Sequence, residues 1–78
     1  MNNTIEIIDV STSNFKVIHK WENIIDFGKF PIPNINDVIY INSNYYTVTE
    51  RKYIYNMVNR IISEKTEIKI KIFVKYVI

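Results

Sequence analysis

The residues whose types could best support a chemical function are basic side chains. They gather, together with aromatic rings, in the C-terminal part of the chain. Residues 51–78 carry seven Lys and Arg against two Glu, whereas residues 1–50 carry three Lys against six Asp and Glu. Cations along a phosphate backbone, beside rings that stack on bases, are typical of proteins that bind single-stranded RNA or DNA. The candidate residues are Arg51, Lys52, Arg60, Lys69, Lys71 and Lys75, with Phe73 and Tyr45 as neighbouring rings.

The same lysines have a simpler explanation as the solvated face of a strand. Charge asymmetry alone does not distinguish a binding surface from a face that is merely hydrated. The sequence pI of about 8.9 also lies below the range typical of nucleic-acid-binding domains. Binding of single-stranded nucleic acid is therefore the alternative hypothesis rather than the leading one.

Residue types that perform catalysis or bind metals are sparse. His19 is the only His, and the chain has no Cys and one Gly. A zinc site without Cys would need at least two carboxylates beside His19, and one Gly cannot form a glycine-rich phosphate loop. The eight Asp and Glu are scattered along the chain, as is usual for solvated side chains. We therefore predict a protein that is not an enzyme and that holds no metal or cofactor.

The composition dictates which elements must position these residues. Of the 78 residues, 17 are Ile, seven are Val and five are Thr, and Leu, Ala and Gln are absent. β-branched residues favour strands, and the absent residues are among the best helix formers. A chain of this length forms one domain with a thin core. We expect residues 1–78 to form a single β-rich domain.

Alternation of apolar and polar residues predicts the first two strands, over residues 4–10 and 15–21. In the second strand the expected inward face carries Phe15, Val17, His19 and Trp21, and the other face carries Lys16, Ile18 and Lys20. Residues 22–36 contain the only Gly and both Pro, which interrupt strand pairing. We expect a connecting loop there, beginning with one helical turn at residues 23–27.

A hairpin is predicted over residues 37–49. Two strand-like runs are separated by Asn42-Ser43-Asn44, a three-residue loop that Asn44 can close in the left-handed conformation. If Ile41 pairs with Tyr45, one face carries Ile39, Ile41, Tyr45 and Thr47, and the other carries Val38, Tyr40, Tyr46 and Val48. Both faces are apolar, so the hairpin is expected either to lie between other parts of the fold or to present one side to a partner.

Residues 50–65 fit two structures. At helical spacing, with Thr49 as the N-cap, the apolar stripe consists of Ile54, Met57, Val58, Ile61 and Ile62. That helix would give an α+β fold with four strands. The scarcity of good helix formers favours a strand that pairs with residues 67–78, with Ile62 opposite Glu67. We favour the strand, and hence an all-β fold that is a small curved sheet or a partially open five-stranded β-barrel.

More apolar side chains are present than one thin core can bury. The faces opposite the predicted core carry Ile39, Ile41, Tyr45, Ile54, Val58, Phe73 and Val77. Homo-oligomerisation through edge strands, or capture of a protein or a small anionic ligand, would cover them. The predicted binding residues are Ile39, Ile41, Tyr45, Arg51, Arg60, Lys69, Lys71, Phe73 and Lys75.

A run of about twenty residues, from Pro33 to Arg51, resembles a known pattern. It reads P-N-I-N-D-V-I-Y-I, then Y-T-V-T-E-R, and is similar to the P-x-V-G-D-x-V-x-I…Y-x-V-x-x-R pattern of short uncharacterised β-barrel proteins from bacteria and phages. Asn36 stands where the pattern has Gly, so the positive φ of that turn is less secure here. The resemblance implies a small barrel and an accessory protein of a phage or mobile element, in which small binders of host proteins or nucleotides are common.

The sequence thus predicts a non-enzymatic binding module that sequesters or inhibits a host protein or a small anionic, nucleotide-like ligand as a homo-oligomer. No run of 18 apolar residues occurs, and the N-terminus lacks the basic and apolar segments of a secretion signal. We therefore expect no membrane association and a cytoplasmic location, in a bacterial host if the resemblance holds.

Overall fold

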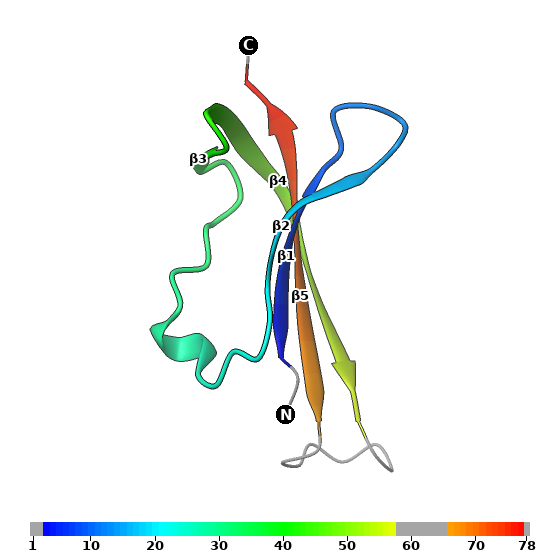
Figure 1. The fold of residues 1–78 in the computed structure, drawn as a ribbon, viewed down its shortest axis with the longest axis vertical. Helices are drawn as coiled ribbons and strands as arrows, with labels where there is room; N and C mark the ends of the chain where they lie inside the picture. The colour runs from blue at the N-terminus through cyan, green and yellow to red at the C-terminus, as the bar shows by residue number, and fades with distance from the viewer. Residues whose placement is uncertain (1–2, 58–65, 78) are drawn as a thin grey trace.

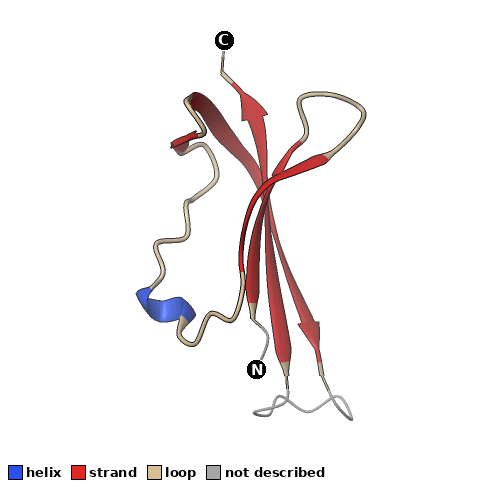
Figure 2. Ribbon diagram, viewed as in Figure 1, coloured by secondary structure: helices blue, strands red, loops and turns tan. Residues whose placement is uncertain are grey.

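The computed structural model describes residues 3–57 and 66–77, and in them the predicted all-β fold is confirmed. Strands make up 58% of these residues, and none of them lies in an α-helix. The elements are β1 (Thr4–Asp9), β2 (Lys16–Trp21), a 3-10 turn η1 (Phe27–Lys29), β3 (Val38–Ile41), β4 (Asn44–Asn56) and β5 (Glu67–Tyr76) (Figure 2).

The strands form one mixed sheet in the order β2-β1-β5-β4-β3. β1 and β5 pair in parallel, and the other neighbouring pairs are antiparallel. The sheet curls into a half-barrel, in which the long strands β4 and β5 run side by side (Figure 1). β5 is therefore the central strand, and β2 and β3 are the edges that closure of a barrel would bring together.

The parallel pairing of β1 with β5 rests on matched rows of isoleucine. Ile5 lies beside Ile70 and Ile7 lies beside Ile72, and all four side chains are buried. A buried isoleucine side chain contributes about 1.5–3 kcal/mol relative to an exposed one. Because both strands alternate Ile with Glu or Lys, their apolar rows meet on one face and their charged rows on the other.

Side chains at the two ends of β1 bond to the backbone of β5. The Ile68 N–H donates to Asn3 Oδ1 at 3.0 Å, and the Tyr76 N–H donates to Ser11 Oγ at 2.8 Å. Short polar side chains that follow or precede a strand can capture backbone groups in this way. These two hydrogen bonds set the register of residues that lie 65 positions apart in the chain.

The core lies on one face of the sheet, which we call the inner face; the opposite one is the outer face. The buried residues of the core, on the inner face, are Ile5, Ile7, Tyr46, Val48, Ile70, Ile72 and Val74. The loop between β2 and β3 packs against this core through Ile24, Phe27, Phe30 and Ile32. The outer face has its own small apolar group, in which Ile8 is buried beside Phe73 and the Phe15 and Phe73 rings lie 6.5 Å apart.

The β3–β4 hairpin differs from the prediction by one residue. Ile41 pairs with Asn44, so the loop has two residues, Asn42 and Ser43, with φ of 52° and 66°. Positive φ at both central positions defines a type I′ turn, whose twist matches that of the strands it joins. The predicted three-residue loop and the pairing of Ile41 with Tyr45 were wrong.

This shift of one residue exchanges the two faces of the hairpin. Ile39 and Ile41 lie on the inner face with Tyr46 and Val48, whereas Tyr45 lies on the outer face. There the rings of Tyr40 and Tyr45 pack 4.8 Å apart. The predicted sharing of one face by Ile39, Ile41 and Tyr45 is therefore corrected: the observed register covers the aliphatic residues and leaves the tyrosine hydroxyls near water.

The β4–β5 pairing confirms the strand and excludes the helix over residues 50–56. Asn56, rather than Ile62, lies opposite Glu67, so the predicted register was wrong. The offset is even, and an even offset keeps each side chain on its expected face. Ile72 and Val74 accordingly lie in the core. Val58, Arg60, Ile61 and Ile62 lie outside the described residues.

Two β-bulges bend the sheet. In β2, Ile18 is the extra residue, because Ile7 pairs with His19 and Ile8 pairs with Val17. In β4, Thr49 is the extra residue, and its hydroxyl donates to the Phe73 carbonyl at 3.2 Å. Bulges strengthen the local twist and bend a strand, which helps the sheet to curl.

Local interactions also explain two other departures from the predictions. The bulge turns Ile18 toward the core, and Phe15 and Val17 are exposed on the outer face instead of lying inward, so the alternation predicted for residues 15–18 was wrong. The helical turn expected at residues 23–27 occurs instead at η1, Phe27–Lys29. Asp26 precedes it and accepts a hydrogen bond from the Gly28 N–H at 2.8 Å, and such capping by a short carboxylate starts a turn at the residue that follows it.

The type I′ turn gives a direct test of the hairpin. Ser43→Gly should raise the free energy of unfolding by about 1 kcal/mol, because Ser at positive φ costs energy that Gly avoids. Ser13→Gly, an exposed substitution in the β1–β2 connection, is the control and should change stability by less than about 0.5 kcal/mol. Urea unfolding followed by Trp21 fluorescence measures both. Loss of stability in Ser43→Gly would contradict the turn assignment.

Candidate binding site

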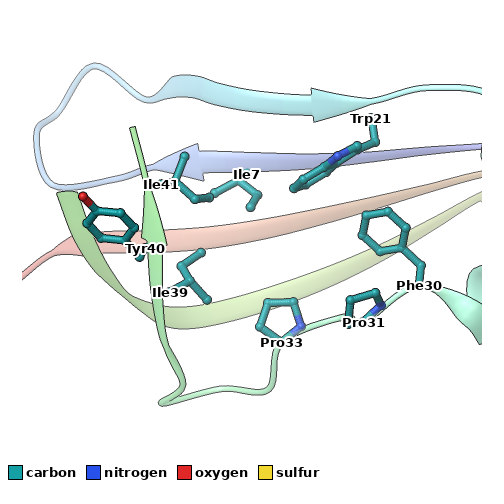
Figure 3. A pocket seen from close by; sticks show the side chains of 8 residues that line it. All are labelled: Ile7, Trp21, Phe30, Pro31, Pro33, Ile39, Tyr40 and Ile41. Atoms are coloured by element: carbon teal, nitrogen blue, oxygen red, sulfur yellow. The ribbon is translucent and has the colours of Figure 1, made fainter. Parts of the chain in front are cut away.

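An apolar cavity of about 300 Å³ lies between the inner face and the loop that follows η1 (Figure 3). It is lined by Ile7, Trp21, Phe30, Pro31, Pro33, Ile39, Tyr40 and Ile41. Its walls thus come from β1, β2, β3 and the loop before β3. We call it the seam pocket, because it sits where the edge strands β2 and β3 face each other across the opening of the half-barrel.

The seam pocket exists because the edges of the half-barrel are held together without pairing as strands. Asn42, in the turn after β3, donates from Nδ2 to the Ile18 carbonyl of β2 at 3.4 Å. Among the described residues, no backbone ladder joins β2 to β3. The edges are therefore close at the turn, and the gap beside it is roofed by the loop carrying Phe30, Pro31 and Pro33.

Three side-chain hydrogen bonds help to fix the loop that forms the roof. The Asn34 N–H donates to Asp37 Oδ2 at 2.8 Å, and Arg51 Nη1 lies 3.5 Å from the Pro33 carbonyl and 3.3 Å from Asn34 Oδ1. Asn36 adopts φ of 76°, a conformation that suits the Gly of the resembling pattern. The two prolines restrict the backbone further. The roof is therefore held by specific contacts rather than by chain connectivity alone.

Aromatic rings form the end of the pocket near β2. The Trp21 and Phe30 rings lie 5.1 Å apart in an edge-to-face arrangement, and the His19 ring packs 4.2 Å from Trp21 on the solvent side. Such pairs contribute about 0.5–1.5 kcal/mol beyond the area they bury. His19 is exposed and stands at the rim of the pocket. Since none of the lining residues carries a charge, the cavity is suited to an apolar group.

The predicted binding residues divide between the two faces. Ile39 and Ile41 line the seam pocket, and Arg51 lies beside Ile72 on the inner face, where it holds the loop. The outer face carries Tyr45, Lys69, Lys71, Phe73 and Lys75. Arg60 lies outside the described residues. The structure therefore does not bring these residues together in one site.

Charges on the outer face are mixed rather than uniformly basic. Lys69 Nζ lies 3.9 Å from Glu6, and Lys52 Nζ lies 3.9 Å from Glu50 and 5.3 Å from the centre of the Phe73 ring. Exposed ion pairs of this kind contribute about 0–1 kcal/mol. Their main effect here is to offset part of the positive charge.

A third exposed pair lies at the end of β2, where Lys20 Nζ and Glu22 Oε1 are 3.0 Å apart. The hydrogen bond to Glu22, and the charge of the same carboxylate, raise the pKa of Lys20. A raised lysine pKa means that the pair stabilises the fold at neutral pH and that this contribution is lost as the pH rises through the pKa.

Six lining residues were not predicted from the sequence: Ile7, Trp21, Phe30, Pro31, Pro33 and Tyr40. Trp21 was expected on one face of the second strand, Ile7 fell within the first strand, and the prolines were assigned to a loop because they interrupt strands. The available signal was the density of rings and prolines in residues 21–33, a composition common in binding grooves. It could not indicate which strands the loop would cover.

Comparison of the chain with protein-family models, with curated proteins and with solved structures finds no match. Within residues 3–57 and 66–77, no helix has the length and apolar character needed to cross a membrane. Acidic and His side chains in the same residues form no group of three that could hold a metal ion.

The anchoring role of Arg51 can be tested by removing its guanidinium. Arg51→Ala should lower the free energy of unfolding by about 1 kcal/mol and speed proteolysis within residues 30–36, because two hydrogen bonds to the loop are lost. Lys52→Ala, its neighbour on the outer face, is the matched control and should cost less than about 0.5 kcal/mol. Equal proteolysis of both variants would contradict the assignment.

Proposed function

We propose that this protein is a non-enzymatic binding module that captures an apolar side chain of a protein partner in the seam pocket. The observation that carries the proposal is a ring-lined cavity of about 300 Å³ without a charged lining residue. Pockets that recognise side chains combine such apolar walls with a few polar groups at the edge. Here the polar group beside the lining is His19, whose exposed ring packs against Trp21.

The chemistry of the pocket favours a protein segment over a small anionic ligand. A nucleotide-like ligand would need a cation to pair with its phosphate. Arg51 is a cation of the inner face that reaches the roof, and its guanidinium already bonds to Pro33 and Asn34. An apolar side chain needs no such partner and would bury the rings of Trp21 and Phe30 from water.

The edges beside the pocket suit an extended partner. β2 and β3 each pair with one neighbour in the sheet, so each has a side whose backbone groups face the seam. A segment lying along either edge could pair with it while alternate side chains enter the pocket. Binding of this kind sequesters the partner segment, which fits the inhibitory accessory role that the resemblance to bacterial and phage barrels implies.

Trp21, the only tryptophan, lies in the seam pocket and reports on its occupation. The probe peptides acetyl-Thr-Phe-Thr-amide and acetyl-Thr-Ala-Thr-amide differ only in the side chain offered to the pocket. We expect the Phe peptide to shift Trp21 emission at concentrations where the Ala peptide has no effect. Adenosine monophosphate tests the anionic ligand in the same assay, and a response to it alone would overturn the proposal.

Two adjacent residues of β3 provide a matched pair of variants. Ile39→Glu places a charge in the pocket and should abolish the response to the Phe peptide, whereas Val38→Glu, at a side chain 60% exposed on the outer face, should preserve it. Circular dichroism is the control that checks whether both variants fold. An unchanged response in Ile39→Glu, or no response in the wild-type protein, would contradict binding in the seam pocket.

Binding of single-stranded RNA or DNA by the outer face is the second candidate function. The observation that favours it is that Lys52 and Lys71 lie directly opposite each other. Like charges in this position destabilise a sheet, and a phosphate bound between them would remove that repulsion. Lys75 and Phe73 lie on the same face.

Salt dependence tests this second function. Titration of a labelled oligonucleotide at about 50 and about 200 mM salt should show an affinity that falls steeply, because bound cations release counterions. Lys71→Glu should weaken binding, and Lys29→Glu, an exposed lysine of η1, should not. Absence of binding at the lower salt concentration would eliminate this function.

A further inference from the structure

The C-terminal half of β4, residues 50–56, has a second edge that no described strand occupies. β3 pairs only with residues 44–47 of β4. Val48 then exchanges backbone hydrogen bonds with the loop, since its carbonyl accepts from Asn36 at 2.8 Å and its N–H donates to Asp37 at 2.9 Å. From Glu50 to Asn56, β5 is the only described strand that pairs with β4. In an antiparallel pair every second residue directs its N–H and C=O away from its partner.

The side chains of this segment leave it open for pairing. Tyr53, Ile54 and Tyr55 are 46%, 36% and 49% exposed, and all three are residue types that strands favour. Natural sheets usually protect a long edge with proline, a bulge or a covering loop. The Thr49 bulge precedes this segment, which itself contains no proline and no bulge.

We propose that a second copy of this chain pairs with residues 50–56 of β4 in an antiparallel arrangement whose two-fold axis passes through Tyr53. A two-fold antiparallel pair must match edge-facing residues with edge-facing residues, so the axis passes through one residue and its own copy. An axis at Tyr53 is the one that uses the whole of residues 50–56.

Charge selects the same axis. An axis at Arg51 would place that residue against its own copy, and an axis at Lys52 would do the same to Lys52; both are destabilising in a sheet. With the axis at Tyr53, Arg51 lies opposite Tyr55 of the partner subunit, so no two guanidinium groups oppose each other. Lys52 then meets Ile54 of the partner subunit. Antiparallel pairing therefore separates the basic residues of the two copies.

This interface is separate from the seam pocket. The pocket lies between β2 and β3, whereas the open edge of β4 begins after β3 has ended. A two-fold axis perpendicular to a continuous sheet keeps the inner faces of both copies on the same side. The pair would thus present two seam pockets in one direction, and neither pocket would be blocked by the interface.

The oligomeric state and a chemical cross-link test the proposal. Sedimentation equilibrium should show a dimer, and Tyr53→Lys should weaken dimerisation at least tenfold because it places two ammonium groups across the axis. Tyr45→Lys is the matched control: Tyr45 is also an exposed tyrosine of β4, 58% accessible, but its segment already pairs with β3, and dimerisation should be unchanged. A monomer at all concentrations, or equal dimerisation of both variants, would overturn the proposal.

The absence of cysteine makes the register testable as well. Directly opposed residues in an antiparallel pair lie within the separation a disulfide can span. Tyr53→Cys should therefore form a disulfide-linked dimer on mild oxidation, and Tyr45→Cys should show no disulfide cross-link after the same oxidation, both read on a non-reducing gel. Faster cross-linking of Tyr45→Cys would overturn the register. The Trp21 response to the Phe peptide is also measured in Tyr53→Lys. Because the interface is separate from the seam pocket, this response tests the function proposed for the pocket independently of dimerisation.

Discussion

A sheet with no second layer must cover its own apolar face, and the rest of this structure depends on that constraint. The core is formed by β1, β4 and β5, and no helix or second sheet lies against it in the described residues. Two features supply the cover: the sheet curls into a half-barrel, and the loop between β2 and β3 packs onto its inner face. Bulges at Ile18 and Thr49 allow the strands to bend without losing their pairing.

The candidate sites follow from the same constraint. A half-barrel leaves a seam between its edge strands, and a loop can roof that seam without filling it, so an apolar cavity remains. The two strands of the β3–β4 hairpin also differ in length. β3 ends after four residues, while β4 continues for thirteen, and the excess of β4 has an edge that β3 does not reach. The pocket and the open edge thus have one cause: the loop and β3 are too short to cover the whole inner face and the whole edge of β4.

Local patterns predicted most of the fold. Alternation placed β1 and β2 within one residue of their observed bounds, and β-branched composition predicted the all-β class. The face assignments show why registers are harder. The β4–β5 register was wrong by an even offset, which left Ile72 and Val74 in the core, but the β3–β4 register was wrong by one residue, which moved Ile39 and Ile41 to the opposite face. Sequence alone does not distinguish these cases, because both depend on the conformation of a turn.

The sequence pattern did not predict the pocket, for a different reason. Its residues come from segments between Ile7 and Ile41 that meet only after β5 has brought β1 and β4 into one sheet. Trp21 and Phe30 are nine positions apart, and the loop with the short 3-10 turn η1 between them does not relate their directions in a way that a pattern can predict. The outer lysines were easier to place, since alternation along a single strand puts Lys69, Lys71 and Lys75 on the same side.

The central position of β5 has a consequence for synthesis of the chain. β1–β2 and β3–β4 are hairpins of neighbouring segments, and isolated hairpins are marginally stable in water. β5, which joins them, is translated after both. Until it arrives, the apolar rows of β1 and β4 have no strand between them, and each hairpin exposes half of a future core. Folding therefore depends on long-range pairing that is possible only after β5 has been translated, which slows it, and the apolar rows of β1 and β4 are most exposed to aggregation before β5 inserts.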